Sequence, residues 1–114
     1  MLKLGAALRF FGLKTCDTCR KALKSLAPFD VEITDVRADG VSDADRQAII
    51  AAFGDAAMNT RSTTWRGLTE EERGLGPDTL LAQHPTLMKR PVIEHDGVWY
   101  QGWNAATKQA LGIE

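Results

Sequence analysis

The start of the chain reads as a strand, a helix and a second strand, and this order constrains the fold more than any other feature. An apolar run broken only by Arg9 predicts a buried strand over 7–12. The segment 17–27 gathers its apolar side chains on one stripe of a helix, which Pro28 ends. The alternating segment 31–36 predicts the second strand. Two parallel strands joined by a right-handed helical crossover are therefore expected.

The middle of the chain predicts helices rather than strands. Ser42 is suited to cap a helix that ends near Gly54. We expect short helices from there to Gln83, with a loop over 61–67 and a further break over 74–77. This segment therefore predicts a helical block between two sheet-forming parts of the chain.

The C-terminal third predicts a hairpin and a last helix. The dipeptide at 96–97 is Asp-Gly, a strong two-residue turn signal, and it separates the strand-like segments 91–94 and 98–101. A last helix is expected over 104–111. The parallel unit and the hairpin can share one four-stranded mixed sheet with helices packed on it. The predicted fold is thus α/β and thioredoxin-like, with an inserted helical lobe at about 42–84.

Composition narrows the class of protein. The chain has 114 residues, of which 44% are hydrophobic and 25% charged, so a single globular domain over 1–114 is expected. Fourteen basic and fifteen acidic residues give a net charge of −1, which does not favour a nucleic-acid partner. The sequence holds no apolar run of about 18 residues, so no membrane span is expected.

The chain has two cysteines, Cys16 and Cys19, in a C-x-x-C arrangement. The two histidines, His84 and His95, lie far from them in sequence, so a zinc site lacks its usual ligands and no metal is expected. The spacing leaves no distant partner for a structural disulfide, which favours a reducing, cytoplasmic setting. In that setting a C-x-x-C pair is more often redox-active than structural.

The positions of the two thiols predict different roles. Cys16 lies where the first strand gives way to the helix, and there free backbone N–H groups and the helix dipole favour its thiolate. Cys19 is three residues before Ala22 and seven before Leu26, which places it on the inward face of the helix. We therefore predict Cys16 as the nucleophile and Cys19 as the resolving cysteine. The alternative is a pair of ordinary cysteines, which the strand–helix context disfavours.

Three separated motifs resemble the ArsC/Spx/YffB family. They are Phe-Gly-Leu-Lys-Thr-Cys-Asp-Thr-Cys-Arg-Lys-Ala at 11–22, Asn-Thr-Arg-Ser-Thr-Thr-Trp-Arg at 59–66 and His-Pro-Thr-Leu-Met-Lys-Arg-Pro at 84–91. The middle motif is most similar to the YffB-like branch. The resemblance implies a thioredoxin-like fold with a helical insertion, reduction that depends on glutathione or another thiol, no bound cofactor, and a cytoplasmic location.

The same resemblance implies an anion-binding role for two arginines. Arg61 and Arg90 match two of the three arginines that hold the oxyanion in arsenate reductases of this family, whereas Gly102 stands near the third position. A guanidinium is permanently charged and grips oxyanions and carboxylates with a planar fork, which suits this role. The resemblance also implies a cis Arg90–Pro91 peptide bond, with Pro91 a structural part of the site.

Three functions remain open from the sequence. The first is a cytoplasmic thiol–disulfide oxidoreductase that uses Cys16 and Cys19, with glutathione or a small thiol or disulfide as substrate. The second is an arsenate reductase, although the family's enzymes of this type have one catalytic cysteine and a third arginine. The third is an Spx-like adaptor that binds RNA polymerase and uses its C-x-x-C pair as a redox switch.

Overall fold

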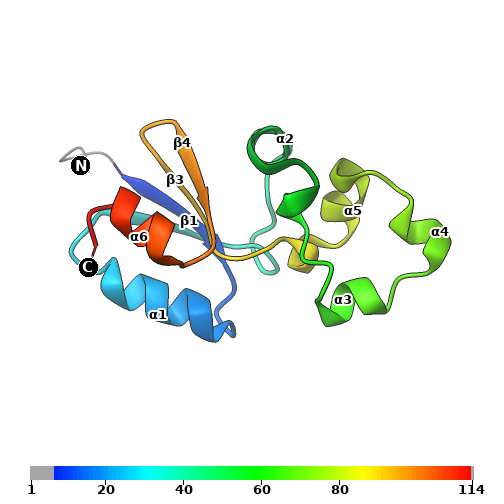
Figure 1. Cartoon of the computed structure of the whole chain (residues 1–114), viewed down its shortest axis with the longest axis horizontal. Helices are drawn as coiled ribbons and strands as arrows, with labels where there is room; N and C mark the ends of the chain where they lie inside the picture. Colours follow the sequence, from blue (N-terminus) through cyan, green and yellow to red (C-terminus); the bar gives the residue numbers. More distant parts are fainter. Residues whose placement is uncertain (1–6, 114) are drawn as a thin grey trace. The chain divides into compact units, whose positions relative to one another are not determined.

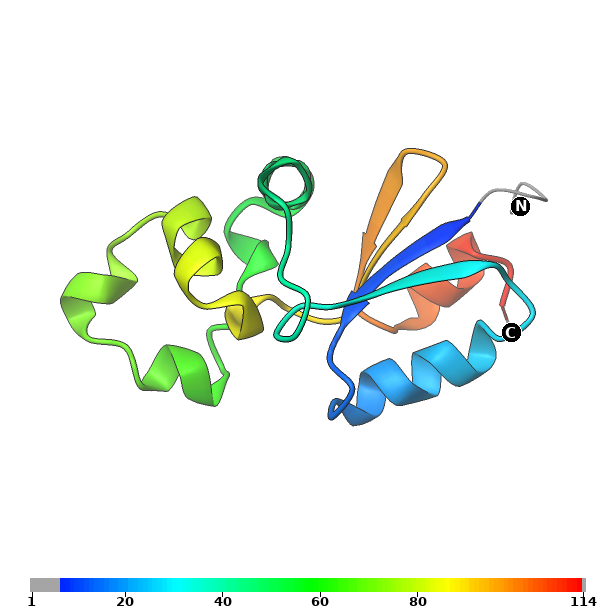
Figure 2. The ribbon, with the colours of Figure 1, turned by 180° about the vertical axis from the view of Figure 1, so that it is seen from behind.

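The computed structural model describes residues 7–113, which form two compact units. One unit contains the described residues through Asp35 and those from Arg90 onward, and the other is Val36–Lys89 (Figures 1 and 2). The second unit spans more of the sequence than the helical lobe predicted at about 42–84. That 1–114 forms a single domain stays a prediction.

A four-stranded sheet organises the first unit. Strand β1 (Leu8–Gly12) pairs in parallel with β2 (Val31–Asp35) and antiparallel with β3 (Val92–His95), which pairs in turn with β4 (Val98–Gln101). The strand order is β2-β1-β3-β4, so β1 is central. This confirms the predicted mixed sheet and the thioredoxin-like fold. The buried run at the start of the chain forms the central strand because both of its faces are covered.

Two helices cover the same face of this sheet, α1 (Asp17–Ser25) and α6 (Ala105–Ala110) (Figures 1 and 2). The side chains packed between them and the strands form one buried core, made of Leu8, Phe10, Cys19, Ala22, Leu26, Ile93 and Leu111. Helix α1 ends earlier than predicted, because Leu26 already leaves helical geometry with φ −90° and ψ 2°. Pro28 follows two residues later and prevents the helix from resuming.

The predicted hairpin and last helix are confirmed. Asp96 and Gly97 both have positive φ, 53° and 81°, which is the conformation of the tight turns that join twisted antiparallel strands. Asn104 caps α6 by accepting the Thr107 backbone N–H at 2.9 Å. The end of β4 is therefore joined to α6 by a short, well-defined connection.

The second unit is helical, as predicted. Its elements are α2 (Asp43–Phe53), η1 (Gly54–Ala57), α3 (Thr63–Arg66), α4 (Glu70–Arg73), α5 (Pro77–Gln83) and η2 (Pro85–Leu87), where η denotes a 3-10 helix. The side chain of Ser42 caps α2, as expected from the sequence. None of the helices formed by residues 7–113 is long and apolar enough to cross a membrane.

One prediction in this unit was wrong. The segment 61–67 was expected to be a loop, but it contains α3. The cause is local, because the Ser62 side chain accepts the Trp65 backbone N–H at 3.1 Å and caps a single helical turn. The break over 74–77 is confirmed as far as Gly76. Pro77 instead begins α5, where a residue without an N–H is tolerated.

Candidate active site around Cys16 and Cys19

The first turn of α1 holds Cys16 at the N-cap. A tight turn after β1 brings it there, in which the Cys16 N–H donates to the Leu13 carbonyl at 3.1 Å. The Cys16 backbone is extended, with φ −85° and ψ 118°, and its carbonyl accepts the Arg20 N–H at 3.0 Å. The thiol is partly exposed. Cys16 therefore faces solvent at the end of the helix where backbone N–H groups have no partner within the helix.

The surroundings of Cys16 favour its thiolate. Partial burial alone would raise the pKa of Cys16, but the pKa is lowered because several donors outweigh burial. The backbone N–H and the thiol of Cys19 face the Cys16 sulfur, and the Arg90 guanidinium contributes both its charge and a hydrogen bond. The thiolate is the nucleophilic form of cysteine, so these donors prepare Cys16 for reaction.

Cys19 has the opposite character. It is 1% exposed and belongs to the core beneath α1. Burial raises the pKa of Cys19 to about 11, although the Leu13 backbone N–H faces its sulfur and favours the thiolate. The neighbouring Cys16 also raises the pKa of Cys19, through a hydrogen bond between the two side chains and through charge. Both cysteines are free thiols in this structure.

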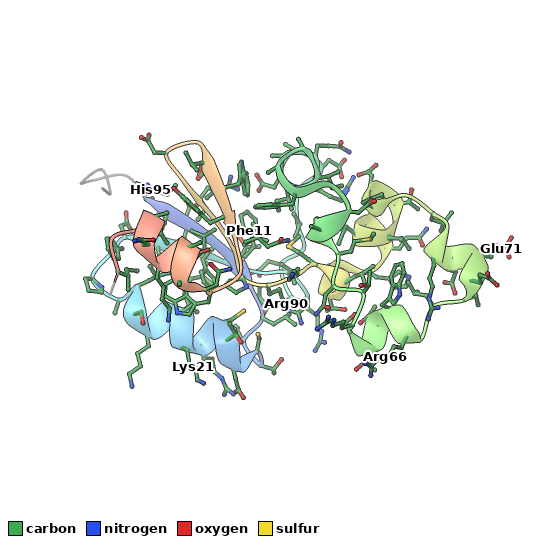
Figure 3. The ribbon with its side chains drawn as sticks, in the orientation of Figure 1. Phe11, Lys21, Arg66, Glu71, Arg90 and His95 are labelled. Carbon is green, nitrogen blue, oxygen red and sulfur yellow. The ribbon has the colours of Figure 1, made fainter. Side chains whose placement is uncertain are left out.

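Arg90 reaches this site from the segment that leads into β3 (Figure 3). The Arg90–Pro91 peptide bond is cis, as the family resemblance predicted. Pro91 is buried, and its carbonyl accepts the Gly102 N–H at 2.8 Å. Backbone hydrogen bonding thus ties the segment carrying Arg90 to the connection that follows β4.

Gly102 occupies the position where the resemblance placed a third arginine. Its φ is +81°, a conformation that side chains rarely adopt. A Cβ built there would lie 3.1 Å from the Asn104 side-chain nitrogen. The backbone at this position is therefore one that favours glycine over arginine.

Arg61 lies in the second unit, just before α3. Its N–H donates to the Asn59 side-chain oxygen at 3.0 Å, which shapes the loop. Arg61 and Lys89 line the same hollow of about 350 Å³, together with Met58, Asn59 and Thr60. Paired backbone hydrogen bonds hold this arrangement, from the Asn59 N–H to Leu87 at 2.8 Å and from the Lys89 N–H to Ala57 at 2.9 Å. Two residues with cationic side chains therefore line this hollow.

The structure thus brings together Cys16, Cys19 and Arg90, with Pro91 next to Arg90. Sequence reasoning overlooked two contributors. Lys89 has no local sequence signal that marks it as a site residue, because it meets Arg61 through backbone pairing between distant segments. The contribution of the Leu13 backbone could not be read from a side-chain pattern, because any residue type supplies an N–H there.

Within residues 7–113, no group of three or more His, Cys, Asp or Glu side chains could hold a metal ion.

Comparison with known proteins connects this geometry to a family. The model of the ArsC family matches residues 11–111. A Haemophilus influenzae protein described as uncharacterized is 41% identical over 107 residues, covering 88% of this chain and 94% of that protein. The solved YFFB protein is 27% identical with a TM-score of 0.82, over 90% of this chain and 96% of that one. An arsenate reductase (ArsC) related protein from Brucella melitensis is 26% identical with a TM-score of 0.71, over 93% and 94% of the two chains.

Proposed function

This chain belongs to the ArsC family, and from that premise we propose that it is a cytoplasmic thiol–disulfide oxidoreductase that uses glutathione. Cys16 is the nucleophile and Cys19 the resolving cysteine. The observation that carries the proposal is the pairing of two unlike thiols within hydrogen-bond contact. One is partly exposed with a lowered pKa, and the other is buried with a pKa of about 11.

The reaction follows from this pairing. The Cys16 thiolate attacks a substrate disulfide, forms a mixed disulfide and releases the first thiolate. Cys19 then loses its proton to solvent and attacks the Cys16 sulfur, which forms the Cys16–Cys19 bond and releases the second thiol. The substrate gains two electrons and the protein dithiol loses them. Two molecules of glutathione restore the dithiol and leave as glutathione disulfide.

The arginines suit a substrate of this kind. Glutathione carries two carboxylates, and guanidinium groups bind carboxylates through paired, charge-assisted hydrogen bonds. We assign the Arg90 guanidinium, which already faces Cys16, to an acidic group near the reacting sulfur. Arg61, which lines a hollow of the second unit with Lys89, stays a proposed anion-binding residue of that unit.

We propose that arsenate is a poorer substrate than a disulfide. An oxyanion with nearly two negative charges loses its hydration when it enters a small site, and incomplete pairing leaves part of that cost uncompensated. Gly102 supplies no guanidinium where the family's arsenate reductases have one. A charge-assisted contact contributes about 1.5–3 kcal/mol, so one missing contact weakens arsenate handling by roughly tenfold to a hundredfold.

A glutathione-coupled reductase assay, run in parallel on a small disulfide and on arsenate, tests the proposal. We expect the wild type to turn over the disulfide faster, Cys16→Ser to be inactive, and Cys19→Ser to accumulate a mixed disulfide on Cys16. Limited alkylation near neutral pH should label Cys16 before Cys19. Lys21→Ala is the matched control on α1, because Lys21 is exposed and projects away from the sheet (Figure 3).

Three outcomes would contradict the proposal. Full activity of Cys16→Ser would show that Cys16 is not the nucleophile. Arsenate turnover equal to that of the best disulfide would indicate an arsenate reductase proper. If neither substrate is turned over and RNA polymerase subunits are captured instead, the Spx-like adaptor becomes the better description.

A further inference from the structure

The end of β1 makes an unusually close approach to the sulfur of Cys19. A Cβ built on Gly12 would lie 2.7 Å from the Cys19 Sγ and 3.3 Å from the Cys19 Cβ. It would also lie 2.8 Å from Cε1 of Phe10. Real Cβ atoms do not approach other atoms as closely as the first and last of these distances. The absence of a side chain at Gly12 is therefore what lets the Cys19 sulfur lie where it does.

The place that Gly12 leaves open is chemically useful. The Cys19 sulfur lies against the strand end with the next backbone N–H, that of Leu13, facing it. The same sulfur is in hydrogen-bond contact with Cys16. A sulfur at this position therefore contacts both a donor that stabilises negative charge and its target, Cys16.

We propose that Gly12 is a positioning residue for the resolving step, because it holds open the seat from which the Cys19 sulfur attacks Cys16. This inference rests on the proposed function and adds a residue to it. In the step concerned, the Cys19 thiol gives its proton to solvent and the S–S bond to Cys16 forms. The bond between Cys16 and the substrate sulfur breaks, and that sulfur leaves as a thiolate with the bonding electron pair.

A methyl group at position 12 should disturb the sulfur more than the fold. Phe10 and Gly12 line a small apolar cavity of about 40 Å³, and we expect the Phe10 ring to shift toward this space. Cys19 is buried on α1 and its Cβ is also close, so rotation of the thiol relieves only part of the overlap. A misplacement of about 1 Å can slow a reaction up to about a hundredfold. We therefore expect Gly12→Ala to slow resolution by about tenfold or more.

The aromatic disulfide dithiobisnitrobenzoate separates the two steps, because each released nitrothiobenzoate is coloured. One reagent molecule mixed with one reduced protein releases a first thiolate when Cys16 attacks and a second when Cys19 resolves. In total the protein loses two electrons and two protons and gains one disulfide. For Gly12→Ala we expect a second phase about tenfold slower than in wild type, about 1.4 kcal/mol in the barrier, with the first phase changed by less than about threefold.

The controls separate failure of this inference from failure of the proposed function. If wild type releases one thiolate per chain, or Cys19→Ser releases two, the resolving role of Cys19 is wrong. The role of Gly12 is wrong if wild type releases two thiolates per chain and Gly12→Ala releases both at wild-type rates. It is also wrong if Gly12→Ala slows the two phases equally. Gly76→Ala is the matched glycine control, because Gly76 has φ −66° and open space around it.

A second variant covers the case in which Gly12→Ala does not fold. Phe10→Leu removes the ring atom that the new methyl group would meet, so Phe10→Leu/Gly12→Ala retains the overlap with Cys19. Compared with Phe10→Leu alone, the double variant should show a slower second phase. Equal second phases in these two proteins would overturn the inference.

Discussion

Arg90 acts on Cys16 from a position that is distant in sequence, and substitution of Arg90 alone tests its effect on the Cys16 pKa. The guanidinium lowers the pKa of Cys16 through charge and a hydrogen bond, against the opposing effect of burial. Arg90→Ala should raise the Cys16 pKa, so that less thiolate is present at neutral pH. The loss of one charge-assisted contact, about 1.5–3 kcal/mol, sets the scale of the effect, a fall in alkylation rate of roughly tenfold to a hundredfold at pH values below the Cys16 pKa.

The measurement is the alkylation rate of Cys16 as a function of pH in Cys19→Ser and in Cys19→Ser/Arg90→Ala, which leaves one reactive thiol. Arg90→Lys should fall between the two, because it keeps the charge and loses the fork. Arg66→Ala is the control, since Arg66 is exposed and lies at the end of α3 (Figure 3). An unchanged profile in Arg90→Ala would mean that the start of α1 alone determines the thiolate.

At the scale of elements, the connection from β4 to α6 explains why position 102 resists arginine. Gly102 has φ +81°, and its N–H donates a hydrogen bond to the Pro91 carbonyl. Any residue with a Cβ is strained there, so Gly102→Ala and Gly102→Arg should each lower the free energy of unfolding, by about 1 kcal/mol or more. Both variants introduce the same backbone strain, but only Gly102→Arg adds a guanidinium. Comparison of the two therefore separates the effect of backbone strain from the effect of the guanidinium.

Arsenate and disulfide turnover should then be measured for both variants. Gly102→Arg is expected to gain on arsenate relative to Gly102→Ala, while disulfide turnover changes similarly in the two. If the two variants handle arsenate equally, the missing guanidinium does not explain poor arsenate turnover.

The elements that the sequence predicted well are those with strong local signals. The buried run before Cys16, the apolar stripe of α1 and the Asp96-Gly97 turn each specify one conformation through their own residues. Helix α3 was missed because a single turn has no periodicity to detect, and only the Ser62 cap marks it. The positive φ of Gly102 comes from the structure, because no flanking turn pattern distinguishes it from an ordinary glycine.

At the scale of the whole molecule, residue spacing predicted the cysteine pair, whereas Arg90 and Pro91 were placed at the site by the family resemblance alone. The position of Cys16 at a helix start and of Cys19 on the inward face follows from spacing within one helix. The contact of Arg90 with Cys16 depends on β3 pairing with β1, which joins segments far apart in the chain. Contacts of this kind depend on the order of the strands in the sheet. Before that order is known, only the motif resemblance indicates that Arg90 lies near Cys16.

The burial of Cys19 also links the redox site to the stability of the reduced protein. The pKa of Cys19 is about 11 in the folded chain, above its ordinary value of 9.0. Between these values the unfolded chain releases the proton while the folded chain keeps it, so the folded state binds more protons and the free energy of unfolding falls as pH rises. The stabilisation is complete below about pH 9, and the loss by pH 11 is roughly 3 kcal/mol at most.

Denaturant unfolding of reduced wild type and reduced Cys19→Ala across this pH range measures the effect. Lysine and tyrosine titrate in both proteins, so their contribution cancels in the difference between the two. The packing lost with the sulfur lowers the stability of Cys19→Ala by an amount that does not depend on pH. We therefore expect the stability advantage of wild type to shrink between about pH 9 and pH 11. Parallel curves would show that Cys19 ionises as readily in the folded chain as in the unfolded one.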